Sequence, residues 1–209
     1  MFERIKETSR KHYEEALARH GDSPQGVDWS GKASQELRFQ ILSEIADLNG
    51  RSVHEVGCGL GHFVDFLDAN AIWCAYVGSD ISAKMIERAR QRLPQIQLYV
   101  ADILDDDANT PPDWLRADYV MASGIFNVML DNDRGVWHDF VEAMVTRMLD
   151  LADKGIAFNL LTSYVDCENP DLFYLPPGDM LDFCIHDMGH HVVIRHDYPL
   201  WEYTVYVYK

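Results

Sequence analysis

The segment SVHEVGCGLGHF, residues 52–63, places three glycines at alternate positions directly behind a short apolar run. Gly57, Gly59 and Gly61 let the backbone turn tightly and approach a ligand closely, because a Cβ atom would obstruct both. The spacing is G-x-G-x-G, and His62 stands where the dinucleotide-binding pattern G-x-G-x-x-G has its third glycine. We therefore expect this loop to hold a ligand at the end of a strand, and the spacing counts against a nicotinamide dinucleotide.

Three acids stand at or near the ends of successive apolar runs. Glu55, two residues before the glycines, would repel a pyrophosphate but attract a cationic ligand. Asp80 lies about 20 residues beyond the loop, where a ribose-binding carboxylate is expected, and its oxygens can accept from both ribose hydroxyls. Asp102 could accept from the exocyclic amine of adenine. The structural alternatives are that Asp80 caps the next helix and that Asp102 opens a loop. Together the acids indicate a ligand that contains a nucleoside.

The elements that would position these residues alternate between strands and helices, which predicts an α/β fold with a mostly parallel sheet and helices on both faces. Two β-rich runs at the C-terminus have almost no connection between them, so this last pair must be antiparallel. The expected strands are 52–56, 72–79, 96–100, 117–123 and 155–163, followed by the closing pair, and the expected helices are 2–20, 34–48, 62–70, 82–93 and 133–152.

Length, composition and charge limit the domain organisation and the class of function. The chain has 209 residues, of which 47% are hydrophobic, so we expect a single domain over 1–209. Residues 1–50 would form a helical lid, and 51–209 the sheet with its substrate loops. With 18 basic and 34 acidic residues the net charge is −16, which disfavours a nucleic-acid partner. The charged N-terminal segment, the absence of a long apolar run and the unpaired spacing of four cysteines predict a cytoplasmic protein without a membrane partner.

The motifs EVGCGLG (55–61), GSDIS (78–82), VADIL (100–104) and DYVMASGIFNV (118–128) together resemble the class I S-adenosylmethionine-dependent methyltransferases. The resemblance spans about 51–209 and implies a Rossmann-like seven-stranded sheet with an antiparallel last strand. It is looser for GVDWSGKASQELRF (26–39), which is similar to uncharacterised stand-alone bacterial members. The implied cofactor is S-adenosyl-L-methionine, and the implied binding residues are Glu55, Gly57, Cys58, Gly59, Gly61, His62, Phe63, Asp80, Ile81, Met85, Asp102, Ile103, Ser123, Gly124 and Phe126.

The acceptor and the catalytic base are less clearly marked. Base-methylating enzymes carry an N/D-P-P-Y/F signature after the fourth strand, whereas this chain has SGIF there, so a small-molecule acceptor is the leading expectation. The candidates for a base or acceptor contact are Tyr164, His186 and His190, and no metal is expected. Arg38 could reach the cofactor's carboxylate or form a salt bridge. A non-catalytic cofactor-binding module and, less favoured, a nucleotide-dependent oxidoreductase remain alternatives, and the sequence predicts no oligomeric state.

Overall fold

In a computed structural model, residues 2–27, 31–105, 113–189 and 191–209 are described. Trp29 and His190 lie outside these residues. The helices are α1 (Glu3–His20), α2 (Lys32–Ser43), α3 (His62–Ala69), α4 (Ala83–Arg92), α5 (Arg134–Leu151) and α6 (Pro177–His186), with short 3-10 turns η1 (Pro24–Val27) and η2 (Asp113–Leu115). Within the described residues, none of these helices is both long enough and apolar enough to span a bilayer.

The strands form one sheet in the order β3-β2-β1-β4-β5-β8-β7, and a two-residue strand, β6, pairs with β5 off this path. The strands are β1 (Ser52–Val56), β2 (Ala75–Asp80), β3 (Gln97–Val100), β4 (Ala117–Ala122), β5 (Ala152–Thr162), β6 (Tyr174–Leu175), β7 (His191–Arg195) and β8 (Glu202–Tyr208). Neighbours from β3 to β5 run parallel, whereas β8 is antiparallel to both β5 and β7. The mostly parallel sheet and its antiparallel C-terminal strand are therefore confirmed.

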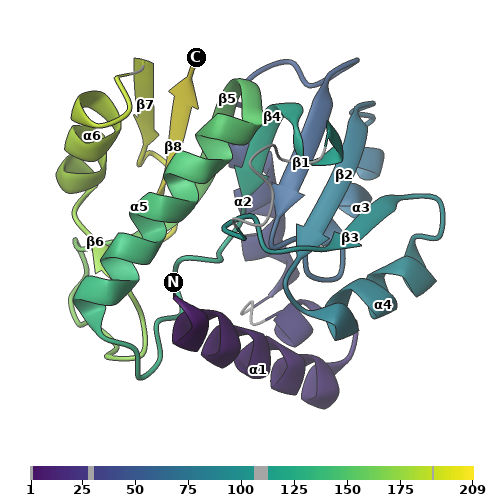
Figure 1. The fold of residues 1–209 in the computed structure, drawn as a ribbon, viewed down its shortest axis with the longest axis horizontal. Helices are drawn as coiled ribbons and strands as arrows, with labels where there is room; N and C mark the ends of the chain where they lie inside the picture. The colour runs from purple at the N-terminus through teal and green to yellow at the C-terminus, as the bar shows by residue number, and fades with distance from the viewer. Residues whose placement is uncertain (1, 28–30, 106–112, 190) are drawn as a thin grey trace.

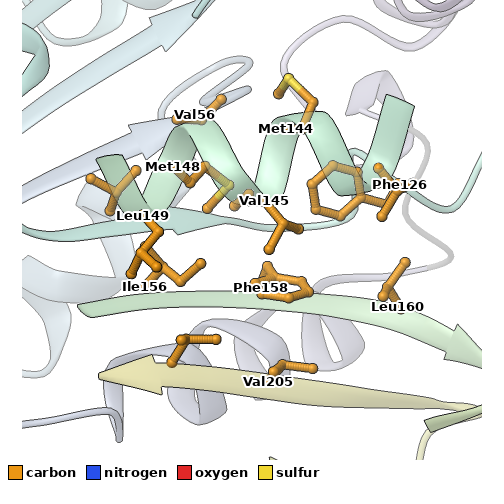
Figure 2. Close-up of a cluster of buried hydrophobic side chains, with 14 of the residues drawn as sticks. Val56, Phe126, Met144, Val145, Met148, Leu149, Ile156, Phe158, Leu160 and Val205 are labelled. Atoms are coloured by element: carbon orange, nitrogen blue, oxygen red, sulfur yellow. The ribbon is translucent and has the colours of Figure 1, made fainter. Parts of the chain in front are cut away.

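Helices cover both faces of the sheet, as the alternating pattern predicts. Apolar side chains from α2, α3 and α4 pack on one face, and those from α5 and α6 pack on the other (Figure 1). In α5, Val141, Val145 and Met148 are fully buried against β4 and β5. Figure 2 shows Phe158 of β5 facing this helix within the larger cluster. The two clusters hold the carboxyl ends of the parallel strands at a common edge, where ligands bind in open α/β sheets.

The first helix, α1, lies along this edge (Figure 1) and is tied to it by polar contacts. Lys6 forms a salt bridge with Asp102, which follows β3. Glu14 accepts a hydrogen bond from Ser82 Oγ at 2.9 Å and pairs with Lys84 at 2.7 Å, both beyond β2. These contacts place α1 across the ends of several strands, as a lid would lie.

Three features of the chain differ from the sequence expectation. The second helix ends at Ser43, although Ile45 and Leu48 in the following turn are still buried. The helical spacing of apolar residues extends beyond the end of the helix, because the turn that follows also directs its apolar side chains into the core. The other two features are β6 and α6, in the segment 174–186, where the sequence pattern predicted neither a strand nor a helix. Pro177 occupies the first turn of α6, where its fixed φ favours a helix and its missing N–H costs nothing.

Candidate functional site

A cavity of about 400 Å³ lies at the carboxyl ends of the parallel strands, bounded by α1 and α2. This volume is within the range of small-ligand sites. Twelve of the predicted cofactor residues line it: Glu55, Gly57, Cys58, Gly59, His62, Asp80, Ile81, Met85, Asp102, Ile103, Ser123 and Gly124. The sequence motifs from four strand ends thus converge on one cavity.

The glycine loop has the backbone conformation that its sequence predicts. Gly57, Gly59 and Gly61 have φ angles of 69°, 52° and 74°, a left-handed region that side chains other than glycine rarely adopt. A Cβ atom on Gly57 would lie 2.3 Å from Ile125 Cγ2, so the close approach also requires glycine there. Gly61 does not line the cavity and instead starts α3. Its role in this structure is to turn the chain into the helix.

Asp80 joins the end of β2 to the glycine loop. One carboxylate oxygen accepts from Gly59 N at 3.0 Å and the other accepts from Ser82 N at 2.8 Å. Burial raises the pKa of Asp80, and these two N–H donors oppose the increase. The helix cap of α4 is Ser82 itself, whose Oγ accepts from Met85 N at 3.2 Å. Asp80 therefore does not serve as the helix cap, and each of its oxygens retains a lone pair for a further donor.

Glu55 is 4% exposed and accepts a hydrogen bond from the Tyr76 hydroxyl. Burial raises the pKa of Glu55 to about 8; the hydrogen bond from Tyr76 opposes the increase and the nearby Asp80 carboxyl adds to it. The carboxyl is therefore mostly neutral at pH 7 while the cavity holds no cation. A cationic group placed beside it would favour the carboxylate and lower this pKa.

Asp102 is in contact with the first helix, α1. One oxygen pairs with Lys6 Nζ and the other accepts from Leu104 N at 2.9 Å. The sequence marks the carboxylate but not its lysine partner, because Lys6 is one of several charged residues on an exposed-looking helix. A ligand amine at Asp102 would have to share the carboxylate with Lys6 or displace it.

His62 lines the cavity with both ring nitrogens engaged. Gln35 Nε2 donates to His62 Nδ1 at 3.1 Å, and His62 Nε2 donates to the Asp22 carbonyl at 3.0 Å. Burial lowers the pKa of His62, and the backbone contact opposes this effect. A neutral imidazole held from both sides suits a wall of the cavity better than a base that must exchange protons.

The loop after β4 carries two buried polar atoms that have no hydrogen-bond partner in the described part of the chain. They are Ser123 Oγ and Asn127 Oδ1, and both residues line the cavity. Between them, Gly124 N donates to Asn159 Oδ1 at 2.8 Å. Since an unpaired buried polar group costs about 1–3 kcal/mol, these atoms suit a ligand that offers hydrogen-bond donors.

Besides Gly61, two predicted cofactor residues, Phe63 and Phe126, do not line the cavity in this structure. Phe63 is 1% exposed and packs with Phe39 and Tyr76 under the sheet, because its helix turns that face toward the core. Phe126 is fully buried and packs edge-on against Phe158. Figure 2 shows both side chains within the apolar cluster. Apolar spacing does not reveal which aromatic side chains reach a ligand.

Two candidates for a base are also displaced from the cavity. Tyr164 is 68% exposed and stacks with His196, with ring centroids 6.1 Å apart. His186 is exposed at the end of α6, where its Nδ1 contacts the Asp182 carbonyl at 2.9 Å. The third candidate, His190, lies outside the described residues. The described residues therefore give no support to either placed candidate as a catalytic base.

A group of potential metal ligands lies on α5, away from the cavity lining. The ligand atoms of His138, Asp139 and Glu142 are all within 4.8 Å of one another. His138 Nε2 and Glu142 Oε1 are 3.8 Å apart, a spacing common for residues one helical turn apart on a surface. We assign no metal to this group.

Comparison with known proteins identifies the family. The family model described as a methyltransferase domain matches residues 54–147. "Putative methyltransferase Rv1506c" of Mycobacterium tuberculosis is 34% identical over 163 residues, which cover 76% of this chain and 93% of that protein. The chain belongs to the methyltransferase family. This confirms that the chain is a methyltransferase, as its sequence motifs predicted.

Two further likenesses place this methyltransferase among its relatives. Trans-aconitate 2-methyltransferase of Rhodopseudomonas palustris is 32% identical over 115 residues, 51% of this chain and only 42% of that protein. The structure of magnesium protoporphyrin IX methyltransferase from Synechocystis, with bound S-adenosylmethionine, aligns with a TM-score of 0.64 and 15% identity over 96% of this chain and 97% of that chain. At this identity the structural likeness shows the fold alone, and it agrees with the sheet order described above.

Proposed function

We propose that this methyltransferase uses the cavity to bind S-adenosyl-L-methionine and transfers the methyl group to a small-molecule acceptor. The observation that carries the proposal is the convergence of the glycine loop, Asp80, Asp102 and the loop after β4 on a single cavity. When bound, the cofactor supplies an electrophilic methyl group on a sulfonium centre. The residues of the chain have to align donor and acceptor and exclude water.

The cavity residues divide into groups that fit the parts of the cofactor. Asp80 can accept from the ribose hydroxyls while it keeps the glycine loop in place. Ile81, Ile103 and Met85 provide apolar walls for the adenine. Glu55 and the unpaired oxygens beyond β4 suit the positively charged and donor groups of the methionine part. Each of these assignments is a proposal that follows from the chemistry of the side chains present.

The acceptor end of the cavity favours a small molecule with little negative charge. Its walls include Val128, Leu161 and Leu172. The cationic side chains among the described lining residues already face acids, since Lys6 contacts Asp102, Arg10 lies 3.9 Å from Glu14 and Arg38 pairs with Glu202. Trans-aconitate carries several carboxylates, and the three described cations, each already in contact with an acid, leave too little positive charge to bind all of them, even if one cation also contacts a ligand carboxylate. We therefore do not extend the acceptor of those relatives to this chain.

The experiment that tests the proposed function is a methyl-transfer screen. The purified chain is incubated with S-adenosylmethionine carrying an isotopically labelled methyl group and with fractions of small neutral and aromatic metabolites. Acceptor-dependent release of S-adenosylhomocysteine, together with a labelled product, is the expected result. Cofactor binding without any acceptor-dependent turnover would instead favour the non-catalytic binding module. The family match removes the oxidoreductase alternative.

A further inference from the structure

A buried ion pair joins α2 to the first residue of β8 at one end of the cavity. Arg38 Nε and Nη2 each lie 2.7 Å from Glu202 Oε2, and Arg38 Nη1 donates to the Ser34 carbonyl at 3.0 Å. The Arg38 side chain is 11% exposed and the Glu202 side chain 0%. Taking both charges out of water costs free energy that a pair of apolar residues would not cost, so a stability role alone explains this pair poorly.

Asn159 extends this pair to the loop that follows β4. In the β5–β8 ladder, Leu161 is opposite Glu202 and Asn159 is opposite Thr204. Residues two apart on a strand share a face, so Asn159 and Glu202 lie diagonally on the same face of the sheet. Asn159 Oδ1 accepts from Gly124 N at 2.8 Å. Hydrogen bonds thus join Gly124 to Asn159 and Arg38 to Glu202, and the two pairs meet where Asn159 and Glu202 lie diagonally on the sheet.

The outer members of these two pairs, Gly124 and Arg38, both line the cavity, whereas Asn159 and Glu202 do not. Burial raises the pKa of Glu202, and the Arg38 charge opposes the increase, with a smaller contribution from the Asn159 amide. Even so, Asn159 Nδ2 and Glu202 Oε1 complete no hydrogen bond of ordinary geometry among the described residues. The buried groups therefore support the cavity wall without touching a ligand themselves.

The cationic residues of the lining are divided between the two ends of the cavity. Lys6 and Arg10 belong to α1, beside Asp102 and Glu14, whereas Arg38 belongs to α2. The proposed cofactor has one anionic group, the carboxylate of its methionine part, and a guanidinium can bind a carboxylate through paired hydrogen bonds. Arg38 is the one cation of the described lining that does not belong to α1.

We propose that Glu202 and Asn159 are positioning residues, which hold Arg38 and Gly124 in the orientation that binds the carboxylate-bearing end of the cofactor. This inference rests on the proposed function. Glu202 fixes the plane of the guanidinium before the ligand arrives, and Asn159 fixes the Gly124 backbone at the same end. A site whose supporting residues are already hydrogen-bonded loses less conformational freedom on binding.

The test compares two ligands that differ at this end. S-adenosylhomocysteine carries the amino-acid part, whereas 5′-methylthioadenosine keeps the nucleoside and the sulfur but lacks the carboxylate. Both are titrated calorimetrically into the wild-type protein and Glu202→Gln, which keeps Arg38. We expect the variant to lose about tenfold in affinity for S-adenosylhomocysteine, as for one charge-assisted hydrogen-bonded contact, and less than about twofold for 5′-methylthioadenosine.

Asn159→Ala provides a second variant if Glu202→Gln does not fold, and it is expected to lose about threefold, again only for S-adenosylhomocysteine. The double variant Arg38→Met/Glu202→Leu replaces the charges with apolar side chains and is expected to fold, yet to show a smaller preference for S-adenosylhomocysteine over 5′-methylthioadenosine than the wild-type protein. Asp118→Asn is the control, because it weakens a 2.9 Å ion pair with Lys154 near the amino ends of β4 and β5, away from the cavity lining, and is expected to change neither affinity.

Each outcome decides between a positioning role and a structural one. A loss confined to S-adenosylhomocysteine supports the proposal. Equal losses for both ligands, or unchanged affinities in Glu202→Gln and Asn159→Ala, overturn it, because the ion pair would then act only on the fold. A double variant that keeps the wild-type preference overturns it as well. Failure of the wild-type protein to bind either ligand refutes the proposed function itself, so the two failures can be told apart.

Discussion

Asp80→Asn tests the proposed ribose contact with a change of a single atom. In the wild-type protein the carboxylate serves two backbone N–H groups, Gly59 N and Ser82 N. The asparagine amide has one acceptor oxygen, so its NH₂ group must face one of these donors or turn away. About one charge-assisted hydrogen bond is lost, roughly 1.5–3 kcal/mol, which corresponds to about a tenfold to hundredfold weaker affinity for S-adenosylhomocysteine by calorimetric titration.

The same variant separates ribose binding from support of the loop through a double-mutant cycle. S-adenosylhomocysteine and its 2′-deoxy analogue are each titrated into the wild-type protein and Asp80→Asn. If Asp80 accepts from the ribose, removing the hydroxyl weakens binding to the wild-type protein much more than to the variant, with a coupling of about 1 kcal/mol or more. If Asp80 only holds Gly59 and Ser82, the two losses add, and the ribose assignment is refuted. Asp118→Asn again serves as the control.

Three other variants test the loop, the lid and the buried acid. Gly59→Val forces a branched side chain to φ 52° with its Cβ 3.2 Å from a Val27 methyl group, so calorimetry should detect no cofactor binding; normal binding would place the ligand elsewhere. Lys6→Met removes the contact between α1 and Asp102. If this ion pair contributes about 1 kcal/mol to closure over the ligand, dissociation measured by stopped-flow fluorescence should be about fivefold faster. An unchanged dissociation rate would argue against a lid. The affinity for S-adenosylmethionine should rise as the pH rises toward about 8, because the cationic ligand binds better to ionised Glu55. Glu55→Gln should abolish this pH dependence. A wild-type affinity that stays constant from about pH 6.5 to about pH 8.5 would contradict the prediction.

The pH dependence of stability at Glu55 has a defined sign. Its pKa in the folded protein, about 8, is above the ordinary value of 4.5, so the neutral form is favoured in the folded state. This contribution is fully present below the ordinary pKa and is lost as the pH rises through about 8. The free protein should therefore melt at a lower temperature as the pH rises across this range, and Glu55→Gln should flatten that dependence.

Much of the fold could be predicted from the sequence, because local pattern and burial agree in the central strands. The run 52–56 is β1 to the residue, and its parallel neighbours are apolar because helices cover both faces. His54 lies within this strand and is fully buried, with Leu115 O and Ser79 Oγ as hydrogen-bond partners. The antiparallel pairing of the last two strands also followed from a connection too short to cross over a sheet, and β7 and β8 are antiparallel.

The site was predictable where its chemistry is carried by short motifs and not where it depends on contacts distant in sequence. Asp80 and the glycines are marked by their spacing behind strands. Lys6 and Glu202 are not, because their partners lie 96 and 164 residues away and no local pattern distinguishes them from surface charges. Phe126 shows the converse: it belongs to a site motif, yet its side chain is buried in the apolar cluster with α5, and only the packing reveals this.

The measurement that tests the central claim most directly is a calorimetric titration of the purified protein with S-adenosylhomocysteine, with NAD as a parallel control. The account predicts binding of S-adenosylhomocysteine with a dissociation constant in the micromolar range and no binding of NAD, because the glycine spacing and Glu55 suit a cationic nucleoside cofactor and not a pyrophosphate. Binding of NAD, or of neither ligand, would contradict the assignment of this cavity as the cofactor site.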